Sequence, residues 1–345
     1  MPDGEKRFIL DANTEAMTGL ALVTGCSGFI GSHLVASLLQ QGVSLKGLSR
    51  HPDRCPAGNG CDYIEGDLRR PGTLAGIAEG VHTVYHLAGY AHATDPSSAI
   101  HHELTVEGTR RLLAEARRWG VSRFVYVSSV KAMPGHPVDC VDETWKSRPD
   151  DDYGRTRRLA EDLVFRTGKS CGMHVSVLRP ALVYGAGCKG NLASMMKWIS
   201  RGLFPPIPAT NNIRSMVDVR DLVRAIIRAA EAPAANGRDY IITDGQDYTT
   251  RQIYTAMCIS LDRKVPRWVV PSPILRLAGR AGDTAERLLG RPLAYNSAVC
   301  SRLLDSACYR SIRATRDLGF KPLYRLQDAL PGMVRQFRIQ SDKGA

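Results

Sequence analysis

Residues 20–37 read LALVTGCSGFIGSHLVAS, and this stretch decides the fold. Its first four residues are apolar, as in a buried β-strand, and residues 33–41 continue at helical period. The glycine-rich turn between them points free backbone N–H groups and the positive end of the helix at one spot. A strand, glycine turn and helix in this order are typical of a site that binds the pyrophosphate of a dinucleotide.

The three glycines of the turn have different roles. Gly25 allows the tight turn, Gly28 lets the backbone approach the phosphates, and Gly31 permits close packing of helix on strand. Phe29 and Ile30 lie between them and are expected to contact the same cofactor. A glycine string alone is often only a structural turn, but the flanking strand and helix favour the binding site.

The end of the next expected strand, residues 44–49, bears on the choice of cofactor. Folds that bind NAD usually place Asp or Glu here to accept hydrogen bonds from the adenosine ribose. This chain has Ser49 and Arg50 instead, with Arg54 close behind. A guanidinium suits a 2′-phosphate, so we predict NADP as the preferred cofactor and NAD as the alternative. A solvated loop arginine is the competing interpretation.

Strands and helices alternate along the first half of the chain. We expect strands at 62–65, 81–87 and 124–127 and helices at 71–79, 97–119 and 153–167. This order predicts an α/β fold with a doubly wound parallel sheet.

Two further pairs of residues follow expected strands and are assigned to the cofactor. Asp67, followed by Leu68, is a short acid that can reach the adenine. Ala88 and Gly89 are small and let a flat cofactor pass close to the end of their strand.

The chain of 345 residues is long enough for two domains. We expect a flexible extension at 1–17 and a dinucleotide-binding domain at 18–185, completed by parts of 214–243. A smaller C-terminal α/β domain, mainly 186–340, is expected to bind the substrate. Its pattern is less regular, and the expected elements are helices near 191–201, 219–231, 249–260 and 272–289 and a strand at 239–243.

Composition excludes several classes of function. No run of 18 apolar residues exists, so no transmembrane segment is predicted. The net charge of +12 comes from arginines spread along the chain with few interleaved aromatics, which disfavours nucleic acid as a partner. Nine scattered cysteines without a CxxC pair predict neither a disulfide framework nor a zinc site, and they indicate a reducing cytoplasm.

Two groups of residues are set aside. The histidines at 82 and 86 lie along an expected strand, and those at 101 and 102 lie on an expected helix. We do not assign any of them to a metal. The expected helix 272–289 carries Arg276, Arg280 and Arg287 on an apolar frame. Such a helix can lie on a membrane, but we favour a solvated face.

The candidate catalytic residues are Ser129, at the carboxyl end of the strand 124–127, and Tyr153 with Arg157. Open α/β sheets bind their ligands at this end of the strands. The i, i+4 spacing places Tyr153 and Arg157 on one helix face. A tyrosine exchanges a proton with a carbonyl or alcohol oxygen when a fixed positive charge stabilises its phenolate, and a serine hydroxyl beside it holds the same oxygen.

The motifs together resemble the extended short-chain dehydrogenase/reductase family, and within it the nucleotide-sugar epimerases and dehydratases. They are TGCSGFIG (24–31), GDL (66–68), HLAG (86–89), VEGT (106–109), VSSVKAM (127–133), YGRTR (153–157), LRPALVYG (178–185), RSMVDVRDL (214–222) and LGFKP (318–322). Seven of them stand in order over residues 20–185, and the last two extend the resemblance to nearly the whole chain.

The resemblance implies a Rossmann-type fold and a role for each site residue. Ser129 would bind the C4 oxygen of a sugar and Tyr153 would be the general acid/base. Arg214 would lie near the diphosphate of the nucleotide sugar, and Asn191 near its phosphate or sugar. Pro180 falls in a cofactor-binding motif, and the implied setting is polysaccharide biosynthesis.

Two positions depart from the family pattern. The lysine of the YxxxK motif is Arg157, which keeps the charge but has a longer, planar side chain. The asparagine usual before VxGT is Thr105. Either change puts full activity in doubt, while Lys131 is a candidate second cation near the site.

We therefore expect an NAD(P)-dependent enzyme acting at C4 of a UDP-hexose or N-acetylhexosamine derivative, and we favour a 4-ketoreductase because Arg50 suits exchangeable NADPH. The alternatives are a UDP-sugar 4-epimerase, a reductase of a non-sugar carbonyl such as a steroid, and a cofactor-binding protein impaired by Arg157. The helices at 97–119 and 153–167 are candidates for a four-helix homodimer interface.

Overall fold

The computed structural model describes residues 19–56, 60–89, 98–133, 139–146, 148–291, 293 and 295–342. The extension expected at 1–17 lies outside these residues. Within them, no helix is both long enough and apolar enough to cross a membrane.

Seven parallel strands form the central sheet in the order β3-β2-β1-β4-β5-β6-β9, which confirms the predicted doubly wound α/β fold. The strands are β1 (Leu20–Thr24), β2 (Leu45–Ser49), β3 (Cys61–Glu65), β4 (Val81–His86), β5 (Arg123–Val127), β6 (His174–Pro180) and β9 (Arg238–Ile242). The chain runs outward from β1 to β3 and then returns to the other side of β1 at β4. The carboxyl ends of β1 and β4 therefore flank the crevice where such sheets bind ligands.

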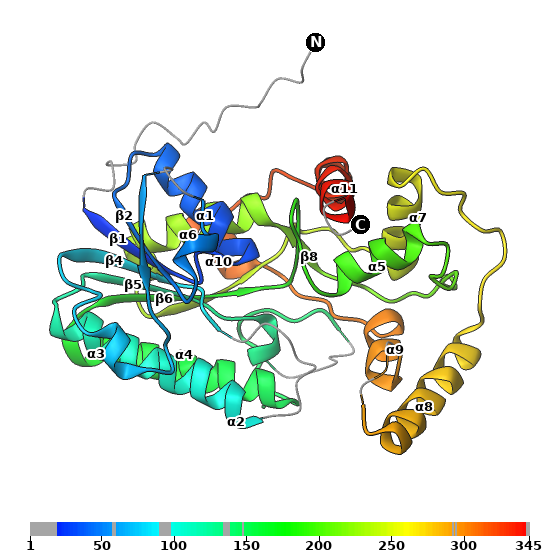
Figure 1. The fold of residues 1–345 in the computed structure, drawn as a ribbon, viewed down its shortest axis with the longest axis horizontal. Helices are drawn as coiled ribbons and strands as arrows, with labels where there is room; N and C mark the ends of the chain where they lie inside the picture. Colours follow the sequence, from blue (N-terminus) through cyan, green and yellow to red (C-terminus); the bar gives the residue numbers. More distant parts are fainter. Residues whose placement is uncertain are drawn as a thin grey trace, which may run out of the picture.

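Helices cover both faces of the sheet (Figure 1). One face packs against α1 (Phe29–Gln40), α6 (Val219–Glu231) and α10 (Ile312–Leu318), and the other against α3 (Gly108–Arg118) and α4 (Asp152–Cys171). The strands are apolar on both faces because both are buried in these two cores.

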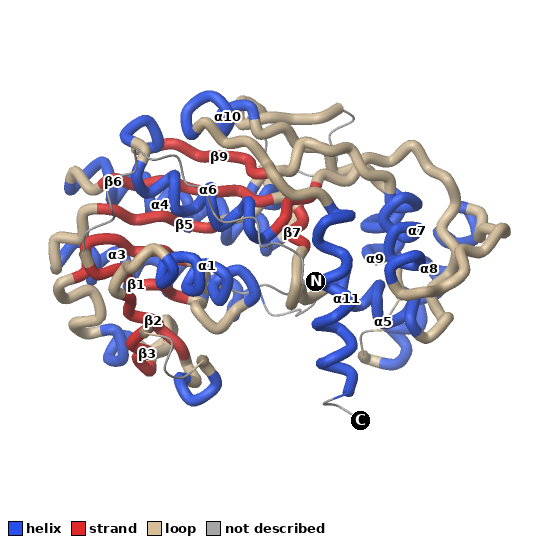
Figure 2. Tube along the Cα trace, turned by 90° about the horizontal axis from the view of Figure 1, so that it is seen from above, coloured by secondary structure: helices blue, strands red, loops and turns tan. Residues whose placement is uncertain are grey.

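A second lobe lies beside the carboxyl ends of the strands (Figures 1 and 2). Its described part holds a small parallel sheet of two strands and five helices, and most of their buried side chains form cores separate from those of the main sheet. These elements are β7 (Leu182–Tyr184), β8 (Met216–Asp218), α5 (Asn191–Ser200), α7 (Thr250–Ser260), α8 (Ser272–Leu289), α9 (Ser297–Leu304) and α11 (Leu326–Asp342).

One helix prediction was wrong, and another is confirmed with a local change of helix type. The helix expected at 71–79 is only a 3₁₀ turn, Pro71–Leu74, because Gly76 and Gly80 adopt positive φ angles of 74° and 71° that no right-handed helix contains. The helix expected at 97–119 is divided, in its described part, into α2 (Ser98–His101), a π-helical turn (His102–Glu107) and α3.

The cysteines also require a correction, since Cys140 and Cys308 form a disulfide across a sequence separation of 168 residues. The sequence predicted no disulfide framework and did not anticipate this bond, because a pair brought together by the tertiary fold leaves no local spacing signal. Beside the disulfide, Val141 forms a parallel β-bridge with Tyr309. The disulfide thus ties the chain that follows β5 to the chain that follows α9.

Candidate functional site

Every residue predicted to bind or to catalyse lines a single cleft of about 890 Å³ at the carboxyl ends of the strands. These residues are Gly25, Gly28, Phe29, Ile30, Gly31, Ser49, Arg50, Asp67, Leu68, Ala88, Gly89, Ser129, Tyr153, Arg157, Pro180, Asn191 and Arg214. They are spread along residues 25–214 and belong to the main sheet and to the second lobe, so the fold brings together what the motifs suggested.

The glycine turn forms a tight cradle at one end of the cleft. Gly25 has a positive φ of 70°, and a Cβ there would stand 2.8 Å from the amide nitrogen of Ala88. A Cβ on Gly31 would stand 2.1 Å from the carbonyl oxygen of Gly25. Helix α1 begins at Phe29 with neither a capping side chain nor an acid in its first turn. Its first N–H groups therefore remain available for an anion, which fits a dinucleotide pyrophosphate.

The ends of β2 and β3 shape the wall expected to face the adenosine. Ser49 is buried and accepts a hydrogen bond from the amide of His51 at 3.2 Å, while Arg50 is exposed. The Asp67 carboxylate binds the Arg69 guanidinium at 2.6 Å, and this hydrogen bond is the main cause of its lowered pKa. Asp67 therefore already has a partner, whereas Arg50 presents the cation expected for a 2′-phosphate.

Arg157 lies buried under the floor of the cleft. Its Nη1 donates to the hydroxyl of Tyr126 at 3.3 Å and to the carbonyl of Val127 at 3.2 Å. Its guanidinium carbon lies 5.2 Å from the ring centre of Tyr153. A Cβ on Gly89 would stand only 2.7 Å from Nη2, so no larger residue fits there without a shift. Arg157 is thus a fixed cation held between β5, α4 and the end of β4.

The charge of Arg157 is maintained despite its burial. Burial by itself lowers the pKa of this guanidinium, but the attraction of the Tyr153 and Tyr126 hydroxyls outweighs it, and the net shift is upward. The group therefore stays protonated at any working pH.

His86 supports Tyr126 from below. Its Nδ1 lies 2.7 Å from the hydroxyl of Thr24 and its Nε2 lies 2.9 Å from that of Thr109. Its ring stacks on Tyr126 at 5.3 Å between centroids. Burial, with a smaller contribution from the charge of Arg157, lowers the pKa of His86 to about 3. His86 is therefore a neutral structural residue, and no described group of three His, Cys, Asp or Glu side chains is placed to hold a metal.

A glycine brings the catalytic candidates toward each other. Tyr153 is in the first turn of α4, whose start is capped by Asp151, with its carboxylate 2.7 Å from the amide of Gly154. A Cβ on Gly154 would stand 2.1 Å from the carbonyl oxygen of Lys131. Because this glycine lets α4 lie against the turn after β5, Tyr153 reaches the cleft beside Ser129, which caps that turn by accepting from the amide of Lys131 at 3.2 Å. Sequence reasoning missed this role of Gly154.

The opposite end of the cleft is cationic. Arg214 is held by β-bridges to Tyr248 and Ala307, and its Nη1 donates to the carbonyl of Asp305 at 3.4 Å. Burial lowers the pKa of Arg214, and the nearby charge of Arg302 adds to that effect. Two guanidiniums at one end of a cleft suit a diphosphate.

Several lining residues had no signal in the sequence. They are Lys189 and Gly190 before α5, Ala298, Ser301 and Arg302 of α9, and Ser306, Ala307 and Tyr309 beyond it. They belong to no motif, and the tertiary fold alone brings α9 and the chain after it to the cleft that the motifs form.

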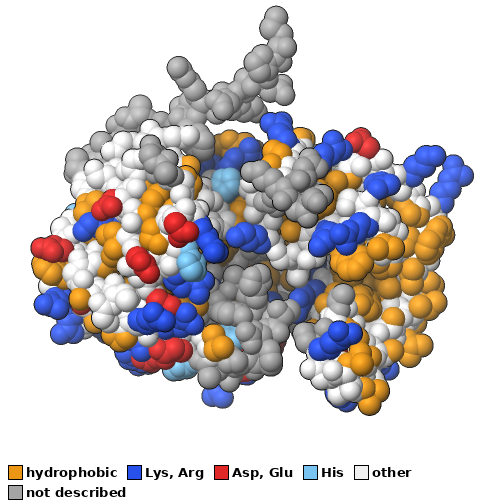
Figure 3. All heavy atoms as spheres, viewed as in Figure 1, with side chains coloured by type: hydrophobic (Ala, Val, Ile, Leu, Met, Phe, Trp, Pro, Cys, Tyr) orange, Lys and Arg blue, Asp and Glu red, His pale blue; other side chains and the backbone are white. Residues whose placement is uncertain are grey.

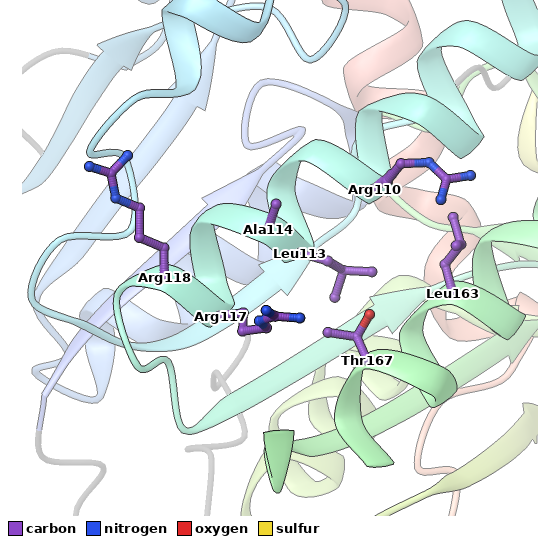
Figure 4. Close-up of a pocket in the computed structure, with 7 residues that line it drawn as sticks. All are labelled: Arg110, Leu113, Ala114, Arg117, Arg118, Leu163 and Thr167. Carbon is purple, nitrogen blue, oxygen red and sulfur yellow. The ribbon is translucent and has the colours of Figure 1, made fainter. Parts of the chain in front are cut away.

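A second hollow lies on the outer side of α3 and α4 (Figure 4). It has a volume of about 470 Å³ and is lined by Arg110, Leu113, Ala114, Arg117, Arg118, Leu163 and Thr167. None of the predicted catalytic or binding residues lies in it. It is formed by the two helices considered for a dimer interface, and that assembly stays a prediction.

Comparison with known proteins places the cleft in context. The model of the NAD-dependent epimerase/dehydratase family matches residues 21–243. A UDP-glucose 4-epimerase of Vibrio cholerae is 31% identical over 326 residues, which cover 92% of this chain and 94% of that protein. A 3-beta-hydroxysteroid dehydrogenase of Mycolicibacterium neoaurum is 28% identical over 90% of this chain and 89% of that protein. The structure of a Thermotoga maritima UDP-glucose 4-epimerase with UDP-glucose superimposes with a TM-score of 0.76 at 22% identity, covering 93% of this chain and 99% of that one, which supports the fold.

The depressed pKa of His86 predicts how stability responds to acid. Below the ordinary imidazole pKa of about 6.5 the unfolded chain binds a proton that the folded protein refuses until about pH 3. The free energy of unfolding therefore falls as pH drops through this window, at up to about 1.4 kcal/mol per pH unit from this residue. Denaturant unfolding from pH 7 to pH 4 should show a shallower fall for His86→Gln than for wild type. The exposed His51→Gln serves as control, and an unchanged slope in His86→Gln would contradict the assignment.

Proposed function

Because the chain belongs to the NAD-dependent epimerase/dehydratase family, we propose that it is an NADP(H)-dependent 4-ketoreductase of a diphosphate-linked sugar, a UDP-hexose or N-acetylhexosamine derivative. The observation that carries the proposal is that one cleft contains the glycine cradle, the Ser129–Tyr153–Arg157 group and the half-buried Arg214. An anion site at each end, with proton-transfer chemistry between them, matches a cofactor and a substrate that both carry phosphates.

A dinucleotide is typical of the family, and the chain offers it a complete set of contacts. The α1 N-terminus and its glycines would hold the pyrophosphate, and Ser49 with Arg50 would hold the 2′-phosphate. Ala88 and Pro180 line the path toward Tyr153. When bound, the cofactor supplies the hydride donor for a keto group or the acceptor for an alcohol.

The protein's own contribution is the proton. The Ser129 hydroxyl hydrogen-bonds the C4 oxygen, and Tyr153 gives that oxygen a proton during reduction or removes one during oxidation. Arg157 places a fixed positive charge 5.2 Å from the centre of the Tyr153 ring. Because the guanidinium is held by Tyr126 and Val127, it acts from beneath the cleft floor, while Lys131 is exposed in the cleft as a second cation.

The substrate end favours a diphosphate over a neutral substrate. Arg214 and Arg302 are two like charges in the wall of the cleft, and an anion would offset their repulsion, whereas a steroid carbonyl offers no such charge. Asn191, exposed at the start of α5, would contact the phosphate or the sugar.

A 4-epimerase is the second candidate, supported by the name of the Vibrio cholerae relative. An epimerase keeps its cofactor bound and returns the hydride, whereas a reductase exchanges it. Arg50 suits the 2′-phosphate of NADPH, and NADPH is the cofactor that a reductase binds, oxidises and releases. Arg50 therefore favours the reductase. A cofactor-binding protein impaired by Arg157 remains the non-catalytic alternative.

The cofactor preference is tested by reversing the charge at position 50. Wild type should bind NADPH about tenfold more tightly than NADH, or about 1.4 kcal/mol, and Arg50→Asp should reverse the order because a carboxylate repels a 2′-phosphate and accepts from ribose hydroxyls. Isothermal titration with both cofactors measures this. Arg54→Asp, four residues away in an exposed turn, is the matched control. Equal affinities of wild type for both cofactors would refute the assignment.

The reaction itself is tested by incubating the protein with NADPH and a UDP-4-keto-hexose. A reductase consumes one NADPH for each alcohol formed, whereas an epimerase interconverts UDP-sugars without net consumption. Tyr153→Phe keeps the ring but removes the exchangeable proton, so turnover should fall at least about a hundredfold with nearly unchanged NADPH affinity. Chromatography of the products, with absorbance at the reduced nicotinamide band, follows both quantities. Unaltered turnover in Tyr153→Phe would place the chemistry elsewhere.

Arg157 is tested by two substitutions measured across pH. Arg157→Met removes the buried charge, so turnover should be lost. Arg157→Lys keeps the charge on the side chain usual in the family, so it should be tolerated and either raise turnover or shift the basic limb of the pH–rate profile downward. Full activity in Arg157→Met would show that another cation, with Lys131 the first suspect, does this work. An inactive wild type restored by Arg157→Lys would favour the impaired-protein alternative.

A further inference from the structure

The inner face of helix α8 packs against α9 and the residues before it. Leu275 and Gly279 are its buried residues. A Cβ on Gly279 would stand 3.2 Å from Cβ of Cys300, and one on Gly282 would stand 2.2 Å from the carbonyl oxygen of Tyr295. The helix thus lies against α9 and the chain before it through glycines at close range.

The opposite face of α8 is also apolar, and nothing in the described chain covers it. Ile274, Leu277 and Leu288 are 55%, 67% and 82% exposed. With Ala281 they recur at intervals of three, four and seven residues, the spacing of one helix face. We call the outer apolar face the set Trp268, Val269, Ile274, Leu277, Leu288 and Leu289, all of them exposed.

Exposed apolar side chains are concentrated in this lobe. Of the sixteen large hydrophobic side chains exposed in the described residues, nine lie between 198 and 289. Residues 263–270 lie against the chain at 200–207, since the amide of Val270 donates to the carbonyl of Pro206 at 2.9 Å and the Arg263 guanidinium donates to the carbonyl of Ser200. Figure 3 shows hydrophobic side chains gathered over this lobe, with Lys and Arg at its margins. Monomeric proteins rarely expose apolar surface on this scale without a partner for it.

The charge around the outer apolar face is strongly positive. Residues 262–302 contain eight Lys or Arg against three Asp or Glu, a net charge of +5. The acids are already engaged, because Asp262 pairs with Arg338 at 2.9 Å and Asp283 and Glu286 accept from the chain at 293–297. Within the described chain, Arg280 and Arg267 form no ion pair.

We propose that the outer apolar face docks on an anionic lipid bilayer, with α8 lying in the plane of the headgroups. Apolar side chains on one face and arginines on its flank are the pattern of interfacial helices. Trp268, at the edge of the face, is the side chain most enriched at membrane–water interfaces. A second copy of this chain would bring a surface of the same positive sign, so charge complementarity favours anionic headgroups over self-association. The sequence alone favoured a solvated face for this helix; the proposal departs from that expectation because the exposed side chains on this face are apolar.

Docking on this face would place the cationic end of the cleft near the bilayer. Helix α9, which packs on α8, contributes Ser301 and Arg302 to the cleft wall. The substrate end of the site therefore lies one helix away from the surface that contacts the lipid. Docking on lipid does not depend on the proposed 4-ketoreductase activity, so the failure of one of these proposals does not refute the other.

The test is sedimentation of the full chain with vesicles of phosphatidylcholine, with and without phosphatidylglycerol. Wild type should bind the anionic vesicles and release as salt rises. The double variant Leu277→Ser/Leu288→Ser should bind at least about tenfold more weakly because it lacks two apolar side chains that docking would bury in the bilayer. Arg280→Gln and Arg287→Gln should each cost about fivefold. The matched controls are Leu159→Ser/Leu323→Ser, exposed leucines outside the face, and Arg166→Gln, an exposed arginine on α4, and they should bind as wild type.

Controls for folding and for self-association complete the vesicle experiment. Unchanged NADPH affinity and thermal melting in each variant show that the fold is intact, since the replaced side chains are exposed. Absence of binding by wild type at low salt, equal binding to vesicles without phosphatidylglycerol, or equal binding by the Leu277→Ser/Leu288→Ser variant overturns the proposal. So does a wild-type dimer in light scattering that this variant dissociates, because the face would then belong to a second copy of the chain.

Discussion

The burial of the Arg157 guanidinium is the interaction on which the site depends. A charged group removed from water costs several kcal/mol unless its hydrogen bonds are replaced. Here the replacements are the hydroxyl of Tyr126 and the carbonyl of Val127, with the Tyr153 ring over the charge. These partners belong to β5 and α4, so the cation can be held only where the two elements meet. The requirement for glycine at position 89 follows from the same contact.

The side chain that holds Arg157 is itself held by neighbouring strands of the sheet. Tyr126 is stacked on His86, and His86 bonds Thr24 of β1 and Thr109 of α3. The hydroxyl of Thr24 also accepts from the amide of Ala88, in the cofactor wall. Strands β1, β4 and β5 are thereby fixed at their carboxyl ends by a neutral polar network. The cleft floor is rigid for this reason, and Tyr153 has a defined position above it.

The sequence predicted well what is decided locally. The glycine turn, the apolar strands of the first half and the helices at 219–231 and 272–289 all depend on short-range patterns, and the structure contains them at those positions. The prediction from sequence failed for features that depend on contacts between distant segments of the chain. Cys140 and Cys308 meet only in the folded chain, and Arg302 enters the cleft lining only through the tertiary placement of α9. The π-helical turn at 102–107 had no signal in the sequence. The exposure of the outer apolar face likewise follows from which side of α8 its neighbours cover.

The central claim is that a nicotinamide cofactor, bound in the cleft above Arg157, exchanges hydride with C4 of a diphosphate-linked sugar. Transfer of deuterium from NADPH labelled at the reactive nicotinamide carbon tests it directly, with mass spectrometry and NMR of the sugar product. The account predicts one deuterium, located at C4, in wild type and only trace transfer in Tyr153→Phe. Product formed without deuterium, or with deuterium at another carbon, would contradict it.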